Sequence, residues 1–184
     1  MGVSVSDPII IVGTSAFGLS TALHLSQRGY TNVSVFDKKV TGDLTVYHAT
    51  QDAGVQFFLG QPVDEIAYVS TLTGRKAVGI RTRDRFYPSS LVILDLGARD
   101  RDARSGIGHT DSLATPLSWY SNPNSLAEYV PYESASVILL EGDSKRDSKK
   151  AALVGSLVLD LMATSDQRIA MEVSEIVPQI LSRL

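Results

Sequence analysis

The sequence predicts a single α/β domain over residues 1–184, with a mainly parallel central sheet, helices on both faces and a small antiparallel β-meander. Three observations lead to this prediction. A short apolar run that ends in glycine opens the chain, and a helical pattern and a second apolar run follow it. The middle of the chain alternates apolar and polar residues. A last apolar run, at residues 136–143, has the composition of another core strand.

The first pattern is a strand–helix–strand unit. Residues 9–12 are apolar and Gly13 follows them, which is typical of a strand buried on both faces of a parallel sheet. Residues 17–28 have apolar side chains at helical spacing, and Gly29 marks the end of that helix. Residues 32–37 form the second predicted strand. Because such crossovers are right-handed, the two strands are expected to lie side by side in parallel.

The middle of the chain is expected to continue the sheet and then leave it. Residues 40–54 predict a short helix or a turn, which leads to a strand at 55–60. Residues 65–98 alternate apolar and polar positions around a turn at Thr73–Gly74, as a β-meander does, and end in the apolar strand "LVILDLG". Residues 99–117 are polar and rich in Gly, Ser and Thr, which indicates a surface loop or a linker.

Two helices are predicted after the last strand. The first covers about 151–163, and the second is an amphipathic helix over about 167–184. The apolar runs of the chain are too short to span a bilayer, and the N-terminus lacks the order of a signal peptide. We therefore expect a cytoplasmic protein.

The composition argues against several functional classes. Apolar residues make up 43% of the chain, charged residues 20%, and the formal net charge is -3. This balance gives no electrostatic reason to expect nucleic acid or an anionic membrane as a partner. The chain has no cysteine, which excludes disulfides, thiolate metal sites and cysteine nucleophiles. With three histidines and no cysteine, no metal site is expected.

The junction between the first strand and the first helix carries a dinucleotide-binding motif of the Rossmann type. Gly13, Ser15 and Gly18 occupy its three glycine positions. In this motif the first glycine makes a tight turn, the second lets the backbone approach the pyrophosphate, and the third lets helix and strand pack closely. The helix N-terminus offers N–H groups to the phosphates. Asp37 ends the second strand about 20 residues later, where an acid accepts a ribose hydroxyl.

The second glycine of the motif is replaced by Ser15. Its Cβ takes up room beside the pyrophosphate, whereas its hydroxyl can donate to a phosphate oxygen. We therefore expect dinucleotide binding to be weakened and not abolished. The alternative interpretation is a sheet protein in which the glycines serve packing alone.

Beyond this motif, residues 12–37 closely resemble the start of fungal amadoriases, the fructosyl amino acid oxidases. These are FAD enzymes of the D-amino-acid-oxidase and sarcosine-oxidase superfamily. Residues 53–98 are similar to the segment in which that family has its second FAD-contacting strand and its "LAAGA" strand. Residues 117–162 are similar to its C-terminal stretch, where a flavin-linking "CW" precedes a "GDSGHGFK"-type loop. The three matches follow the family's order and cover most of the chain.

The resemblance implies an FAD-binding domain from which most of the substrate domain is missing. Family members are longer, and the missing material would follow Lys38 and lie around residues 99–116. Lys149, the lysine of the "GDSGHGFK"-type loop, is the candidate catalytic residue. The FAD-binding residues that the resemblance implies are Gly13, Ser15, Ala16, Phe17, Gly18, Asp37, Lys38, Val63, Gly97, Gly142, Asp143 and Ser144.

Two departures from the family pattern concern the flavin. Ser118 stands where the family cysteine forms its thioether to the flavin, so any FAD is expected to be non-covalent. Residues 145–148 replace the glycines, histidine and phenylalanine of the loop that passes the flavin ring, which argues against tight binding of that ring.

The leading interpretation is a truncated flavoprotein related to amine oxidases, which would oxidise a C–N bond of an amino-acid derivative by hydride transfer to the flavin. The alternative is a repurposed non-redox protein, either an isomerase or cyclase or a small-molecule binder, that uses the vacated cofactor cleft. A third interpretation is an interaction module. A small-molecule ligand is expected for the first two. A homo-oligomer is expected because loss of the substrate domain would expose apolar surface.

Overall fold

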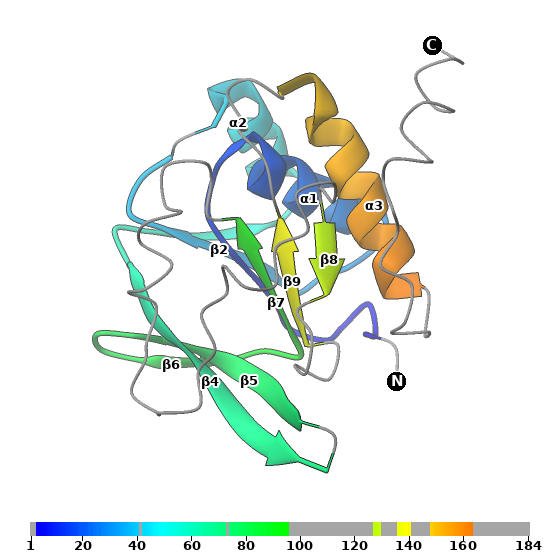
Figure 1. Cartoon of the computed structure of the whole chain (residues 1–184). Helices are drawn as coiled ribbons and strands as arrows, with labels where there is room; N and C mark the ends of the chain where they lie inside the picture. The colour runs from blue at the N-terminus through cyan, green and yellow to red at the C-terminus, as the bar shows by residue number, and fades with distance from the viewer. Residues whose placement is uncertain are drawn as a thin grey trace.

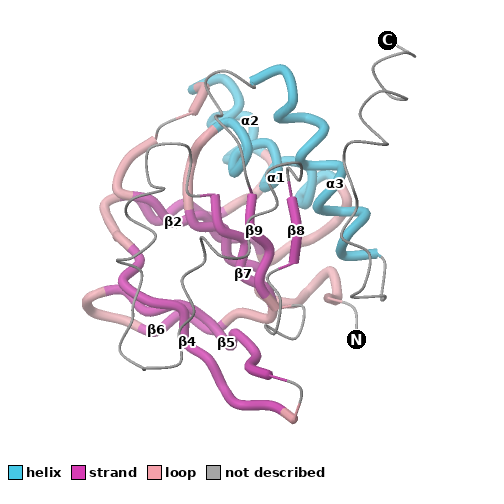
Figure 2. Tube along the Cα trace, in the orientation of Figure 1, coloured by secondary structure: helices cyan, strands magenta, loops and turns pink. Residues whose placement is uncertain are grey.

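The elements of the protein form three layers (Figure 1). Helices form one outer layer, a six-stranded sheet forms the middle layer, and a three-stranded antiparallel sheet forms the other outer layer (Figure 2). The computed structural model describes residues 3–40, 42–72, 74–95, 127–129, 136–140 and 148–163.

The central sheet has the strand order β3-β2-β1-β7-β9-β8. Neighbouring strands run parallel along β3, β2, β1, β7 and β9, and β8 pairs antiparallel with β9. The sequence therefore predicted a mainly parallel sheet correctly. The strands are β1 (Ile9–Val12), β2 (Val33–Asp37), β3 (Gln56–Leu59), β7 (Leu91–Asp95), β8 (Ala127–Tyr129) and β9 (Val137–Leu140).

β1 lies in the interior of this sheet. Ile9 pairs in parallel with Val33 of β2 on one side and with Leu91 of β7 on the other. Ile9 and Ile11 are buried on one face of the sheet and Ile10 on the other, as expected of a strand that is covered on both faces. The predicted parallel neighbourhood of the first two strands is confirmed.

Helices cover one face of the sheet. α1 packs closely against α3, where a Cβ at Gly155 would lie 2.6 Å from Nδ1 of His24. Side chains of both helices join those of Ile9 and Ile11 in one core. Gly29 has a φ of +89° just after α1, a conformation that glycine adopts freely and that ends the helix. The helices are α1 (Ala16–Gln27), α2 (Leu44–Asp52) and α3 (Ala151–Ala163), and the 3-10 turn η4 (Ser148–Lys150) precedes α3.

An antiparallel sheet covers the opposite face, and it consists of β4 (Val63–Thr71), β5 (Gly74–Thr82) and β6 (Phe86–Pro88). Ile66 and Ile80 pack with Ile10 and Val92 of the central sheet. The β-meander expected in this region is confirmed. Helices were expected on both faces, but in the described ranges the second face is covered by this sheet, whose apolar side chains bury the strand residues that a helix would otherwise cover.

The remaining predictions have mixed outcomes. The helix predicted for 151–163 is α3 with the same bounds, and α2 settles the choice between helix and turn at 40–54. The short strand β8 was not predicted. The expected loop at 99–117 and the expected helix at 167–184 lie outside the described residues. No helix of the described ranges is long and apolar enough to span a membrane.

Candidate dinucleotide-binding site

The predicted motif lies where the parallel strands end. β1 runs into the turn at Gly13, α1 begins immediately after it, and β2 and β7 end beside it in Asp37 and Asp95. In open α/β sheets, ligands bind at this carboxyl edge of the strands. The fold therefore brings the motif and two carboxylates to the edge where a dinucleotide is expected.

The two glycines of the motif are required by close packing within the chain. Gly13 has a φ of +120°, and a Cβ there would lie 2.1 Å from the carbonyl oxygen of Asp95. A Cβ at Gly18 would lie 2.4 Å from the carbonyl oxygen of Gly13 and 2.6 Å from Oδ2 of Asp95. Since real Cβ atoms do not approach other atoms this closely, both positions exclude a side chain even without a ligand.

Ser15 is the N-cap of α1. It has an extended backbone, with φ −69° and ψ 176°, and its Oγ accepts a hydrogen bond from the N–H of Phe17 at 3.3 Å. Serine is among the preferred residues for this role, because its oxygen satisfies an N–H that has no partner within the helix. Its side chain is buried, with 8% exposure. The substitution of the second glycine thus has a structural reason. Whether the hydroxyl also donates to a phosphate stays a prediction.

Asp95 is a buried acid that contacts the start of α1. Its Oδ2 accepts hydrogen bonds from the N–H of Gly18 at 2.9 Å and from the N–H of Ser15 at 3.1 Å. The pKa of this carboxyl is raised to about 6: burial is the main cause and the nearby charge of Asp37 adds to it, while hydrogen bonds from Ser15 and Gly18 act in the opposite direction. In the described part of the chain no cation pairs with Asp95.

Asp37 binds the turn that precedes α1. Its Oδ2 accepts the N–H of Thr14 at 2.8 Å and lies 2.7 Å from the Thr14 hydroxyl. Its Oδ1 has one long hydrogen bond within the described residues, from the N–H of Lys39 at 3.4 Å. Asp37 is half-buried, so Oδ1 retains the capacity to accept a ligand hydroxyl.

The segment after Asp37 closes one side of the site. The carbonyl of Lys39 lies 2.8 Å from the Thr14 hydroxyl, and a Cβ at Gly42 would lie 2.7 Å from both the Thr14 carbonyl oxygen and Cδ1 of Leu19. This segment therefore packs directly against the turn of the motif.

The N–H groups at the start of α1 decide whether a pyrophosphate fits. Those of Ser15 and Gly18 donate to Asp95, that of Phe17 donates to the Ser15 Oγ, and that of Leu19 donates to the Ser15 carbonyl. Among the described atoms, the N–H of Ala16 has no acceptor. A ribose hydroxyl fits at Asp37. A pyrophosphate at the start of α1 would compete with Asp95 for the N–H of Ser15.

The other predicted site residues lie in several parts of the fold. Phe17 is buried in the core on the helix-covered face, and Lys38 is exposed directly after Asp37. Val63 begins β4 and packs into the core beneath the antiparallel sheet. Lys149 is exposed in η4, which contacts α1. Gly97, Gly142, Asp143 and Ser144, and also Ser118, lie outside the described residues.

Asp95 was missed by the sequence analysis. The signal was present: an acidic residue in the otherwise apolar run "LVILDLG" is unusual, because carboxylates are rarely buried without a partner.

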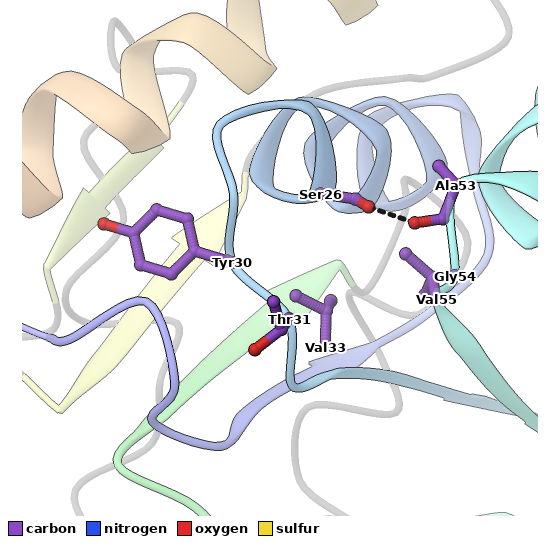
Figure 3. Close-up of a pocket in the computed structure, with 7 residues that line it drawn as sticks. All are labelled: Ser26, Tyr30, Thr31, Val33, Ala53, Gly54 and Val55. Carbon is purple, nitrogen blue, oxygen red and sulfur yellow. Dashed lines mark hydrogen bonds between the residues drawn. The ribbon is translucent and has the colours of Figure 1, made fainter.

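A shallow pocket of about 240 Å³ lies at the opposite edge of the sheet (Figure 3). It lies beside Val33, where β2 begins, and between the end of α1 and the turn after α2, which are joined by a hydrogen bond from the Ser26 hydroxyl to the Ala53 carbonyl. None of its lining side chains is charged, and none belongs to a residue of the motif. They belong to Ser26, Tyr30, Thr31, Val33, Ala53, Gly54 and Val55.

The fold is similar to that of solved oxidoreductases, although no protein-family model matches the sequence and no curated protein matches it. Fructosyl amine:oxygen oxidoreductase (Amadoriase I) from Aspergillus fumigatus superimposes with a TM-score of 0.67 at 12% identity, over 95% of this chain and 90% of that chain. Amadoriase II, the deglycating fructosamine oxidase of A. fumigatus, gives 0.61 at 13% identity, over 94% and 89%. THI4 of Thermovibrio ammonificans gives 0.58 at 12%, over 86% and 89%. At these identities the likeness concerns the fold: this chain has the Rossmann-like α/β fold of these proteins.

Proposed function

We propose that this chain is a flavoprotein domain that binds FAD without a covalent link. The observation that supports this most directly is the Oδ1 of Asp37, which among the described residues accepts one long hydrogen bond and lies at the carboxyl edge of the sheet. In the proposed complex the ribose hydroxyl binds Asp37 and the pyrophosphate lies over residues 13–18, at the N-terminus of α1. The likeness to the amadoriase fold supports the choice of FAD among the dinucleotides.

The proposed reaction class is the oxidation of a C–N bond in an amino-acid derivative. Bound FAD would supply the hydride acceptor, and the protein would supply binding and orientation. Lys149, exposed in η4 near α1, is the proposed catalytic candidate. Because the chain has no cysteine, flavin should leave the protein on acid precipitation and appear in the supernatant.

The decisive experiment is an equilibrium titration of FAD into the purified protein, with Asp37→Ala as the test variant. Loss of the ribose acceptor should weaken binding by about 1–3 kcal/mol. Asp84→Ala is the charge-matched control, since Asp84 is exposed in the turn between β5 and β6. Equal affinities for wild type and Asp37→Ala would contradict the proposed site. Valine at Gly13 or Gly18 is a poor test, because a Cβ there collides with the chain itself.

Ser15→Gly separates FAD binding from a new use of the site. If FAD binds over the turn, restoring glycine should preserve or tighten binding, because it lets the backbone approach the pyrophosphate. A protein that has turned the serine into a ligand contact would lose binding in the same variant.

A second candidate function is a non-redox protein, an isomerase, cyclase or binder, that uses the same edge of the sheet for another small molecule. The position of Asp95 supports it, since a buried carboxylate at the helix N-terminus disfavours a phosphate there. A purified protein that is colourless and stays so when FAD is added would favour this candidate. A yellow protein with flavin absorbance would favour the first.

A further inference from the structure

The carboxylate of Asp95 accepts hydrogen bonds at the N-terminus of α1, where a dinucleotide site of this type binds a phosphate. A phosphate at the start of a helix is bound by backbone N–H groups of the first turn and by the partial positive charge of the helix. Here one oxygen of Asp95 accepts the N–H of Ser15 at 3.1 Å and the N–H of Gly18 at 2.9 Å. Ser15 holds the second glycine position, where the backbone approaches the pyrophosphate, so the carboxylate and a pyrophosphate compete for this N–H and for the N-terminus of the helix.

The described surroundings of Asp95 contain no positive charge that could hold two anions together. β1 and β9 contribute apolar side chains to its neighbourhood, β2 contributes the acid Asp37, and the first turn of α1 has no charged side chain. η4 contacts α1 and carries Lys149 and Lys150, but neither acts on the carboxyl of Asp95. Like charges repel strongly at close range where water is partly excluded.

The carboxylate is held in this position by the fold. Asp95 is the last residue of β7, in a strand that is buried along its length, and 5% of its surface is exposed. Its own carbonyl oxygen lies against Gly13, which leaves no room for the backbone to withdraw toward that side. A phosphate therefore cannot enter without either neutralisation or rotation of this side chain.

We infer that Asp95 is an intramolecular substitute for the cofactor pyrophosphate, so that a phosphate-bearing ligand binds only when this carboxylate is neutralised or turned away. The inference rests on the proposed function in that it uses the same edge of the sheet. It predicts a ligand preference: adenosine, which has no phosphate, is insensitive to Asp95, whereas ADP and FAD are opposed by it. The raised pKa of Asp95, about 6, supports a pH dependence in which affinity for ADP and FAD increases as the pH falls through that value.

The test is a set of titrations of FAD, ADP and adenosine into wild type, Asp95→Asn and Asp95→Ala at pH 8 and at pH 5. The asparagine variant keeps an acceptor for the two N–H groups and removes the charge, whereas the alanine variant also frees the donors. At pH 8 both variants should bind FAD and ADP at least about tenfold more tightly than wild type, with adenosine unchanged. Wild type should approach Asp95→Asn at pH 5. Asp84→Asn, the control for net charge, should behave as wild type.

The outcomes separate this inference from the proposed function. If wild type and Asp95→Asn bind FAD equally at both pH values, the inference is wrong and FAD binding stands. If FAD and ADP bind no variant, inorganic pyrophosphate is titrated into Asp95→Ala while the amide signals of Ser15 and Gly18 are followed by NMR. Shifts confined to the variant would uphold the inference without FAD, and no shift would overturn both. If Asp95→Ala does not fold, as judged by circular dichroism, the same readouts on Asp95→Asn decide.

Discussion

At the scale of single residues, Asp95 connects stability with binding. Burial and the neighbouring Asp37 disfavour the charged form of Asp95. Hydrogen bonds from two N–H groups at the helix N-terminus compensate for this in part. The protein retains this arrangement next to a motif whose expected ligand is itself an anion. The same residue should therefore control the pH dependence of folding in the absence of any ligand.

The first prediction concerns the free energy of unfolding as a function of pH. The pKa of Asp95 is raised from 3.8 to about 6, so the folded state holds this proton more tightly than the unfolded chain does. The contribution of Asp95 is fully present below pH 4 and is lost as the pH rises through about 6, by about 3 kcal/mol in all. The free energy of unfolding of wild type minus that of Asp95→Asn, measured by urea unfolding, should therefore fall as the pH rises from 4 to 8. A difference that rises with pH would contradict the buried, unpaired carboxyl.

The second prediction concerns the helix cap. Ser15→Ala removes the acceptor for the N–H of Phe17 and should lower the free energy of unfolding by about 1 kcal/mol. Ser15→Gly should cost only a few tenths, since glycine also serves at this position. Ser70→Ala, at an exposed position of β4, is the control and should have little effect. Chemical denaturation measures all three, and an equal cost for the two Ser15 variants would show that the hydroxyl does not act as the cap.

At the scale of elements, the sequence was informative where one physical cause dominates. β1 and α3 were located from apolar runs alone, because strands buried on both faces and strongly apolar helices leave clear patterns. The sequence could not predict that the antiparallel sheet covers the second face of the central sheet. Alternation shows that one face of a meander is apolar, but it does not show which element that face packs against. The contact of Asp95 with α1 joins residues 77 positions apart, and no local pattern encodes it.

The third prediction concerns the contact between α1 and α3. A Cβ at Gly155 would lie 2.6 Å from Nδ1 of His24 and 3.1 Å from the Ser20 carbonyl oxygen. Gly155→Ala should therefore lower the free energy of unfolding by about 1–3 kcal/mol, although alanine favours helices. Ser156→Ala, one residue further along and exposed, should be neutral or slightly stabilising. If thermal unfolding shows Gly155→Ala to be more stable than wild type, the helices are further apart than the structure places them.

At the scale of the whole molecule, exposed apolar side chains occur in β3, at an edge of the central sheet, and in α2. Of the described strands, β3 lies at an edge of the central sheet, and such edges can pair with another chain. Leu59 at the end of β3 is 39% exposed, and Leu44 at the start of the neighbouring α2 is 61% exposed. An edge strand that ends in an exposed leucine is a suitable contact for a second copy of the chain across a two-fold axis.

The last prediction is therefore that the protein self-associates through β3. Light scattering of wild type should show a dimer or larger species, and Leu59→Lys should shift the protein toward the monomer, because a charge on an edge strand opposes pairing. Leu72→Lys introduces the same change at the tip of the β4–β5 hairpin, where Leu72 is fully exposed, and should leave the assembly intact. A wild type that stays monomeric at high concentration would contradict self-association altogether. If both variants dissociate equally, the cause is the added charge and not its position in β3. That outcome would contradict a contact through β3.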